Sequence, residues 1–177
     1  MQASVLIEPA GPKYVLYQEI CERLHHLLGA ERNFVANAAN TTALLLQLLP
    51  DINWAGFYIA EGTELVLGPF HGKPTRSRIP FGKGVTGTSA LRSRTIVAPD
   101  VAKFPGNIAR DPDSRSEIVV PLLSWSKMLG VIDLASASPN RFDSEDQEGL
   151  ESVAAVFLAS LTGTDLPDFN EEAAPVS

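Results

Sequence analysis

The stretch that most constrains the fold is Ile79–Thr88, where three glycines and a proline fall within ten residues. Glycines at this density indicate a backbone that turns with positive φ or passes close to another group. The stretch separates a strand-like segment (76–80) from one typical of a short helix (89–92). Farther along, the polar residues Ser114–Glu117 precede the apolar run Ile118–Leu122. Polar groups at the mouths of apolar strands commonly form small-molecule pockets, so we expect one here.

The length and charge of the chain restrict its class. A chain of 177 residues, with 45% hydrophobic and 20% charged residues, is typical of one globular domain with its own core. The net charge of −7 argues against a nucleic-acid partner, because neutralising phosphates requires a basic face. Basic residues do gather between Arg76 and Arg94, with Phe81 the one aromatic residue among them. These basic residues are compatible with a local anion-binding site.

The sequence shows no sign of a membrane or metal protein. No apolar stretch reaches the roughly 18 residues that span a bilayer, and the first residues do not resemble a signal peptide. Cys21 is the only cysteine, which excludes an internal disulfide and a cysteine-rich metal site. The three histidines have no metal-binding spacing. We therefore expect a cytoplasmic protein with no metal, cofactor or membrane partner.

Hydrophobic periodicity predicts an α+β fold in which helices flank an antiparallel sheet. Residues 1–12 should form an irregular lead-in, residues 13–162 the domain, and residues 163–177 a disordered acidic segment. The long loop 98–114 is of a kind that is often a functional lid. The expected helices are 13–28, 31–49 and 143–161, and the expected strands are 53–59, 63–70, 76–80, 95–97, 118–123 and 129–134.

Several motifs in unbroken order resemble one known family. Asn53–Tyr58, Leu67–Pro74, Arg78–Val85, Ser114–Pro121 and Gly130–Leu134 are similar to segments of the free methionine-(R)-sulfoxide reductases, which are single GAF domains. The match covers roughly residues 13 to 162. The resemblance implies a six-stranded antiparallel GAF sheet with a closed pocket between the sheet and a lid loop. It is also compatible with a homodimer formed through the first helices.

The chain departs from this family at its thiols. The family uses a thiolate nucleophile and a resolving cysteine, but the matching positions here are Arg76, Thr86 and Arg110. Neither arginine nor threonine can form a sulfenic acid or a disulfide, so the redox cycle has no chemical basis. Cys21 falls on the apolar stripe of the first helix and is expected to be a buried structural thiol.

The resemblance also assigns a ligand pocket. It places carboxylates at Asp100, Glu117 and Asp133, while a further family acid is replaced here by Ala135. Three converging carboxylates would hold an ammonium group. A lost acid and two gained arginines make the site less negative, so we expect a changed ligand with an anionic group for a guanidinium. The candidate ligand-binding residues are Trp54, Tyr58, Arg76, Thr86, Asp100, Arg110, Ser116, Glu117 and Asp133.

Structural roles for some of these residues stay open. Trp54 is equally typical of a core residue, and Asp100 follows a proline, as turn caps do. Asp133 lies within an apolar strand, where an unpaired carboxylate is costly, so a structural partner such as Arg115 is an alternative. Arg115 itself could instead brace the lid loop.

Three functions follow from these residues. The first is a binding module for a small polar or amino-acid-like molecule. The second is an enzyme of non-redox acid–base chemistry that uses Asp100, Glu117 and Asp133. The third is sulfoxide reduction by a route that does not use the family's cysteines.

Overall fold

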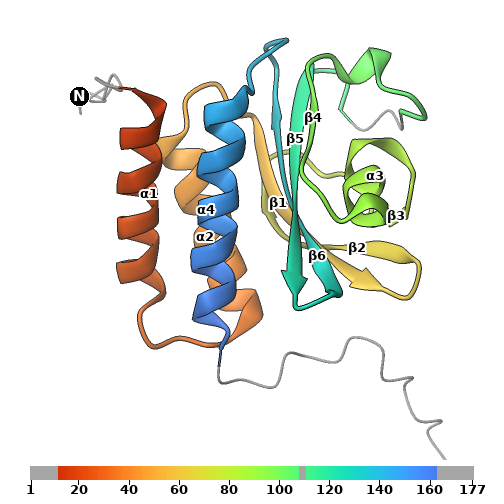
Figure 1. Ribbon diagram of the computed structural model, residues 1–177. Helices are drawn as coiled ribbons and strands as arrows, with labels where there is room; N and C mark the ends of the chain where they lie inside the picture. The colour runs from red at the N-terminus through yellow and green to blue at the C-terminus, as the bar shows by residue number, and fades with distance from the viewer. Residues whose placement is uncertain (1–11, 108–110, 163–177) are drawn as a thin grey trace, which may run out of the picture.

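A computed structural model describes residues 12–107 and 111–162 and confirms the predicted α+β class. Six antiparallel strands form one sheet in the order β3-β2-β1-β6-β5-β4. Helices α1, α2 and α4 cover one face, and the short helix α3 lies on the other (Figure 1). The strands are β1 (Trp54–Glu61), β2 (Glu64–His71), β3 (Arg78–Pro80), β4 (Ile96–Ala98), β5 (Ser116–Ser124) and β6 (Lys127–Ser136). The helices are α1 (Lys13–Leu28), α2 (Phe34–Leu48), α3 (Gly84–Arg92), the 3-10 turn η1 (Val101–Lys103) and α4 (Ser144–Ser160).

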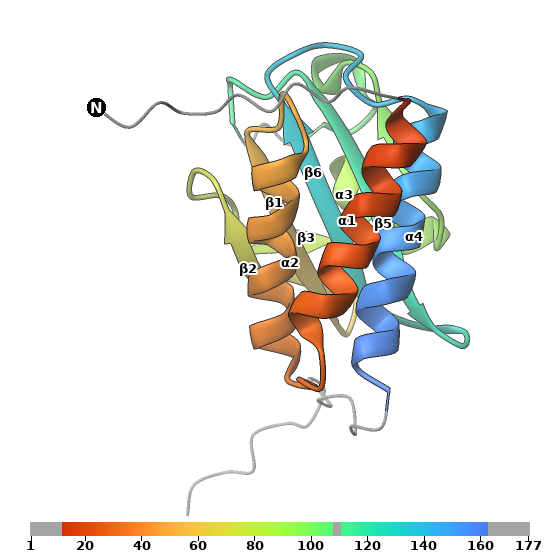
Figure 2. The same ribbon diagram turned by 90° about the vertical axis from the view of Figure 1, so that its left-hand side faces the viewer.

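Three aromatic rings mark the core between the helices and the sheet. Phe57 of β1 lies 4.6 Å from Phe157 of α4 and 6.0 Å from Phe34 of α2, measured between ring centroids. All three side chains are buried. Figure 2 shows the three helices side by side over this face of the sheet. Burial of such side chains supplies most of the stability of a domain of this size.

The start of α4 is fixed by a carboxylate network that also holds α1. Asp143 caps the helix as the sequence predicts, and it forms a capping box with Asp146. Asp146 is fully buried and accepts hydrogen bonds from Tyr17 (2.9 Å), Lys13 (2.6 Å) and Arg141 (3.0 Å). This network satisfies a buried charge, which would otherwise be costly.

The glycine-rich stretch holds a longer helix than the sequence predicts. The expected helix spans 89–92, but α3 already begins at Gly84. A Cβ at Gly87 would lie 2.4 Å from the carbonyl oxygen of Pro80, so only glycine lets the helix approach β3 this closely. The prediction was wrong because glycine disfavours helices in isolation, and here tertiary packing outweighs that preference.

Candidate functional site

Strand alternation places two predicted acids on the α3 side of the sheet. Val119 on β5 pairs with Asp133 on β6, and Glu117 pairs with Ala135. Glu117 and Asp133 are therefore diagonal neighbours on one face. Both are buried, at 6% and 0% exposed. The register of two adjacent strands thus brings these carboxylates together.

Thr86 links the two carboxylates to α3. Its hydroxyl lies 2.9 Å from Oδ2 of Asp133 and 3.1 Å from Oε1 of Glu117. Thr86 sits in the first turn of α3 and is itself buried. The positive end of the helix dipole therefore faces the two acids, an arrangement that stabilises negative charge.

A cavity of about 280 Å³ opens beside Glu117, and we call it the site cavity. Trp54 and Ala135 line it from the sheet, and Lys73 lines it from the β2–β3 loop. The β4–β5 connection contributes Asp111 and Arg115, among others. The predicted pocket between the sheet and this connection thus exists as a cavity with both charged and apolar walls.

The aromatic wall is held in place by backbone carbonyls. The Trp54 indole stacks on Phe70 at 5.6 Å between centroids, and its Nε1 donates to the carbonyl of Lys73 over 3.1 Å. The Tyr58 hydroxyl donates to the carbonyl of Arg76 over 3.0 Å. Trp54 borders the site cavity, whereas Tyr58 lies behind it in the core. Tyr58 therefore positions the β2–β3 loop.

The charges at the cavity form links between loops. Lys73 pairs with Asp113 and lies 3.6 Å from Asp111, so it joins the β2–β3 loop to the β4–β5 connection. These carboxylates raise the pKa of Lys73, chiefly through the hydrogen bond to Asp113. Arg115 lies 3.8 Å from Asp100. The cavity therefore carries both acidic and basic groups.

Besides Tyr58, Thr86 and Asp133, four more of the predicted site residues do not line the site cavity or cannot be placed. Asp100 accepts from the amide of Ala102 over 3.1 Å and does not line the site cavity, which agrees with the open alternative of a turn cap. Ser116 is buried and donates to the carbonyl of Ser138 over 2.6 Å. The side chain of Arg76 is exposed, and Arg110 lies outside the described residues.

Sequence reasoning missed Lys73 and Asp111 as cavity residues. Both are charged residues next to a proline, in the pairs Lys73-Pro74 and Asp111-Pro112. That pattern is typical of any surface loop. What distinguishes Lys73 and Asp111 from other loop residues is their ion pair across the two loops, which forms only in the folded chain.

Neither a metal centre nor a membrane span is found in the described part of the chain. Within 12–107 and 111–162, no group of three or more histidine, cysteine or acidic residues could hold a metal ion. No described helix is long and apolar enough to cross a bilayer.

Comparisons with known proteins define the class. The GAF domain family model matches residues 15–161. The free methionine-R-sulfoxide reductase of Escherichia coli is 43% identical over 157 residues, covering 89% of this chain and 95% of that protein. This protein therefore belongs to the free methionine-R-sulfoxide reductase family of GAF-domain proteins.

Solved structures agree with this assignment. A GAF sensor protein from Burkholderia vietnamiensis superposes with a TM-score of 0.82 at 46% identity, covering 85% of this chain and 99% of that one. The free methionine-R-sulfoxide reductase of Neisseria meningitidis, solved in complex with its substrate, gives a TM-score of 0.83 at 38% identity. It covers 91% of this chain and 96% of that one. The predicted family and its six-stranded fold are thus confirmed.

Proposed function

We propose that this protein binds a small polar, amino-acid-like molecule in the site cavity and that Glu117 holds its ammonium group. The observation that carries the proposal is the position of Glu117, which is 94% buried and yet lines the cavity. A carboxylate has two oxygens with several acceptor sites, so it can accept hydrogen bonds from an ammonium as well as from Thr86. Such charge-assisted hydrogen bonds are among the strongest in proteins.

The opposite charge of an amino acid has partners at the same cavity. Arg115 and Lys73 both line it, and either can meet a carboxylate. A zwitterion therefore matches this site better than a ligand of one charge. The named activity of the relatives supports the class of ligand, because methionine sulfoxide is itself an amino acid.

We propose further that binding here involves no thiol. The only cysteine, Cys21, lies on α1 and packs against the core on the helical face of the sheet. The site cavity opens on the opposite face, beside Glu117 and Thr86. The resemblance places a family cysteine at Thr86, where a hydroxyl now links two carboxylates. These features favour recognition over reduction.

Acid–base catalysis is the second candidate, and the position of Glu117 is the observation that favours it. A buried carboxylate at a cavity wall can transfer protons to a bound molecule. Asp100 does not line the site cavity, and Asp133 lies behind Thr86 in the sheet. The chemistry would then depend on Glu117. Glu117→Gln should abolish turnover of any substrate found, and unchanged turnover would remove Glu117 from the mechanism.

The binding proposal can be tested with the fluorescence of Trp54. The chain has two tryptophans, and Trp125 is fully exposed at the β5–β6 turn. Trp125→Phe therefore leaves Trp54, in the cavity wall, as the only indole. We expect saturable fluorescence changes with at least one member of a panel of amino acids, L-methionine-(R)-sulfoxide, nucleotides and acidic metabolites. The same molecule should raise the melting temperature.

Glu117→Gln is the decisive variant in this background. Loss of a charge-assisted hydrogen bond in a buried site should weaken binding about 10-fold or more. Glu61→Gln is the matched control, because the Glu61 side chain is 41% exposed and pairs with Arg78 at the far end of β1. The proposal fails if no molecule of the panel stabilises the protein, or if both variants bind the ligand equally.

A further inference from the structure

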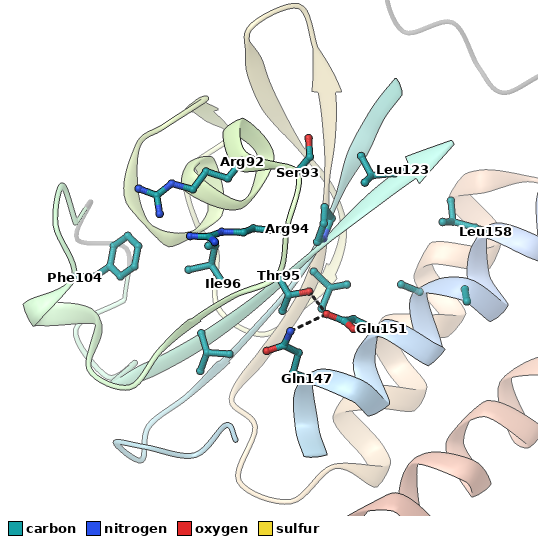
Figure 3. Close-up of a pocket in the computed structure, with 15 residues that line it drawn as sticks. Arg92, Ser93, Arg94, Thr95, Ile96, Phe104, Leu123, Gln147, Glu151 and Leu158 are labelled. Atoms are coloured by element: carbon teal, nitrogen blue, oxygen red, sulfur yellow. Dashed lines mark hydrogen bonds between the residues drawn. The ribbon is translucent and has the colours of Figure 1, made fainter. Parts of the chain in front are cut away.

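A second, larger hollow lies at the edge of the sheet, away from the site cavity. This edge groove has a volume of about 730 Å³ and runs between β4 and α4. Figure 3 shows the hydrogen bonds from Thr95 and Gln147 to Glu151, at 2.6 and 3.0 Å, among the residues that line it. Its apolar floor includes Val120 and Leu158. The groove therefore combines an apolar floor with charged walls.

Two arginines line the groove. Arg92 and Arg94 flank Ser93, whose positive φ turns the chain after α3, and both side chains are exposed. In Figure 3 they project in the same direction, toward the side where Phe104 lies. Neither forms an ion pair with any residue in the described ranges, unlike four other arginines: Arg23, Arg78, Arg115 and Arg141.

Arg92 and Arg94 place two neighbouring positive charges at one groove of an acidic protein. The net charge is −7, so carboxylates outnumber basic side chains, and yet two neighbouring guanidinium groups have no described partner. Glu151 is the acidic residue of the groove, and its Oε1 already accepts from Thr95 and Gln147. The groove is therefore complementary to an acidic occupant that also presents apolar side chains.

The chain itself carries a segment of this composition. Residues 163–177 contain four acids and no basic residue, with Leu166 and Phe169 among the acids. We propose that this acidic segment occupies the edge groove, with its carboxylates on Arg92 and Arg94 and its apolar side chains on the groove floor.

The connection to α4 places the acidic segment within reach of the groove. The helix lines the groove from Gln147 to Leu158, a length of about 16 Å at 1.5 Å per residue. The helix ends at Ser160, so the acidic segment starts three residues beyond its end and five residues after Leu158 in the sequence. Five or six extended residues cover about 16–20 Å. A tethered segment has an effective concentration in the millimolar range, so even weak contacts suffice.

The experiment compares the full chain with a chain ending at Thr162, which keeps every described helix and strand and the family match over 15–161. We expect the amide resonances of Thr95, Val97 and Leu158 to differ between the two chains at low salt. A peptide of residues 163–177 added to the shortened chain should restore them. High salt should remove the difference, because exposed charges are screened.

Paired substitutions test the arginines. Arg92→Gln with Arg94→Gln should weaken binding of the peptide about tenfold, as expected for two exposed ion pairs that each contribute a few-fold. Lys83→Gln with Lys127→Gln removes the same charge from residues that also lack an ion pair among the described residues, and it should change the affinity less than twofold.

Four results would overturn the proposal. The groove resonances of the two chains could coincide at low salt, or the peptide could shift resonances elsewhere on the protein. The difference between the chains could also grow with protein concentration, which would mean that the acidic segment of a second copy fills the groove. Peptide binding that is indifferent to Arg92 and Arg94 would exclude the arginine contacts as well.

Discussion

The hydroxyl of Thr86 donates to Asp133 over 2.9 Å and so ties the first turn of α3 to the centre of β6. The two residues are 47 positions apart in the sequence. The same hydroxyl lies 3.1 Å from Glu117, and since it has one proton it donates to one carboxylate at a time. Thr86 thus provides a polar contact between α3 and the acids beside the site cavity.

Thr86→Val should destabilise the protein because it removes this donor at nearly constant volume. A buried carboxylate that loses a hydrogen bond costs about 1–3 kcal/mol in the free energy of unfolding. Urea denaturation followed by circular dichroism measures the change. Thr86→Ser keeps the hydroxyl and should lose less stability than Thr86→Val. A valine variant as stable as the wild type would show that the contact contributes nothing.

Cys21 should be inert as a redox group. Burial raises the pKa of its thiol, so at neutral pH it stays protonated and unreactive. We expect no turnover of free methionine-(R)-sulfoxide in assays coupled to thioredoxin or dithiothreitol. Alkylation by iodoacetamide should be slower than in the unfolded chain. Rapid reduction that disappears in Cys21→Ser would instead establish sulfoxide reduction by a route that does not use the family's cysteines.

Much of the fold could be predicted from hydrophobic periodicity. The expected end of the first helix before Gly29 is found, because the apolar spacing that defines α1 stops there. The cap at Asp143 is found for a similar local reason. The early start of α3 could not be predicted, because it depends on contacts between Gly87 and Pro80 that exist only in the folded chain. Features that depend on local sequence signals are thus predicted correctly, whereas features that depend on tertiary contacts are not.

The site could be predicted only in part. Glu117 and Asp133 meet because the alternation of two strands places both on one face. Asp100 has the same chemistry but caps a turn, and its sequence neighbourhood fits either role. Lys73 and Asp111 come from separate loops, so no local pattern could show that they line one cavity. A cavity built from loops is therefore the hardest part to infer.

Asp143 should make the stability depend on pH at the acidic end. Its hydrogen bond from Lys13, opposed by partial burial and aided by the amide of Asp146, lowers the pKa of Asp143 from 3.8 to about 2. The folded pKa lies below the unfolded one, so the contribution of Asp143 is complete above about pH 4 and is lost as the pH falls through 2. The side chain is 52% exposed, so screening keeps this effect small.

The measurement for Asp143 is the urea midpoint between pH 2 and pH 6. Asp143→Asn keeps a good helix cap and removes the titrating group, so it should lose less stability below pH 4 than the wild type. Asp51→Asn, at a carboxylate exposed in a loop, is the control and should follow the wild type. Equal losses in all three proteins would mean that Asp143 contributes no pH dependence.

Gly56→Ala should displace the aromatic wall of the site cavity. A Cβ at Gly56 would lie 2.2 Å from the Trp54 indole and 2.7 Å from Cβ of Phe70, so the ring must leave its stack on Phe70. Overpacking of this kind costs about 1–3 kcal/mol. In a Trp125→Phe background, the emission of Trp54 should shift to the red as the indole becomes exposed.

Gly68→Ala on β2 is the matched control for Gly56→Ala. A Cβ at Gly68 would lie 3.2 Å from the end of the flexible Ile59 side chain and from the carbonyl of Phe57, so a small adjustment accommodates it. We expect Gly68→Ala to keep the emission of Trp54 and to lose less stability. Because Trp54 lines the site cavity, Gly56→Ala should also abolish ligand binding at temperatures where the variant is still folded. Retained binding, together with a shifted indole, would mean that Trp54 is a core residue and not part of the ligand site.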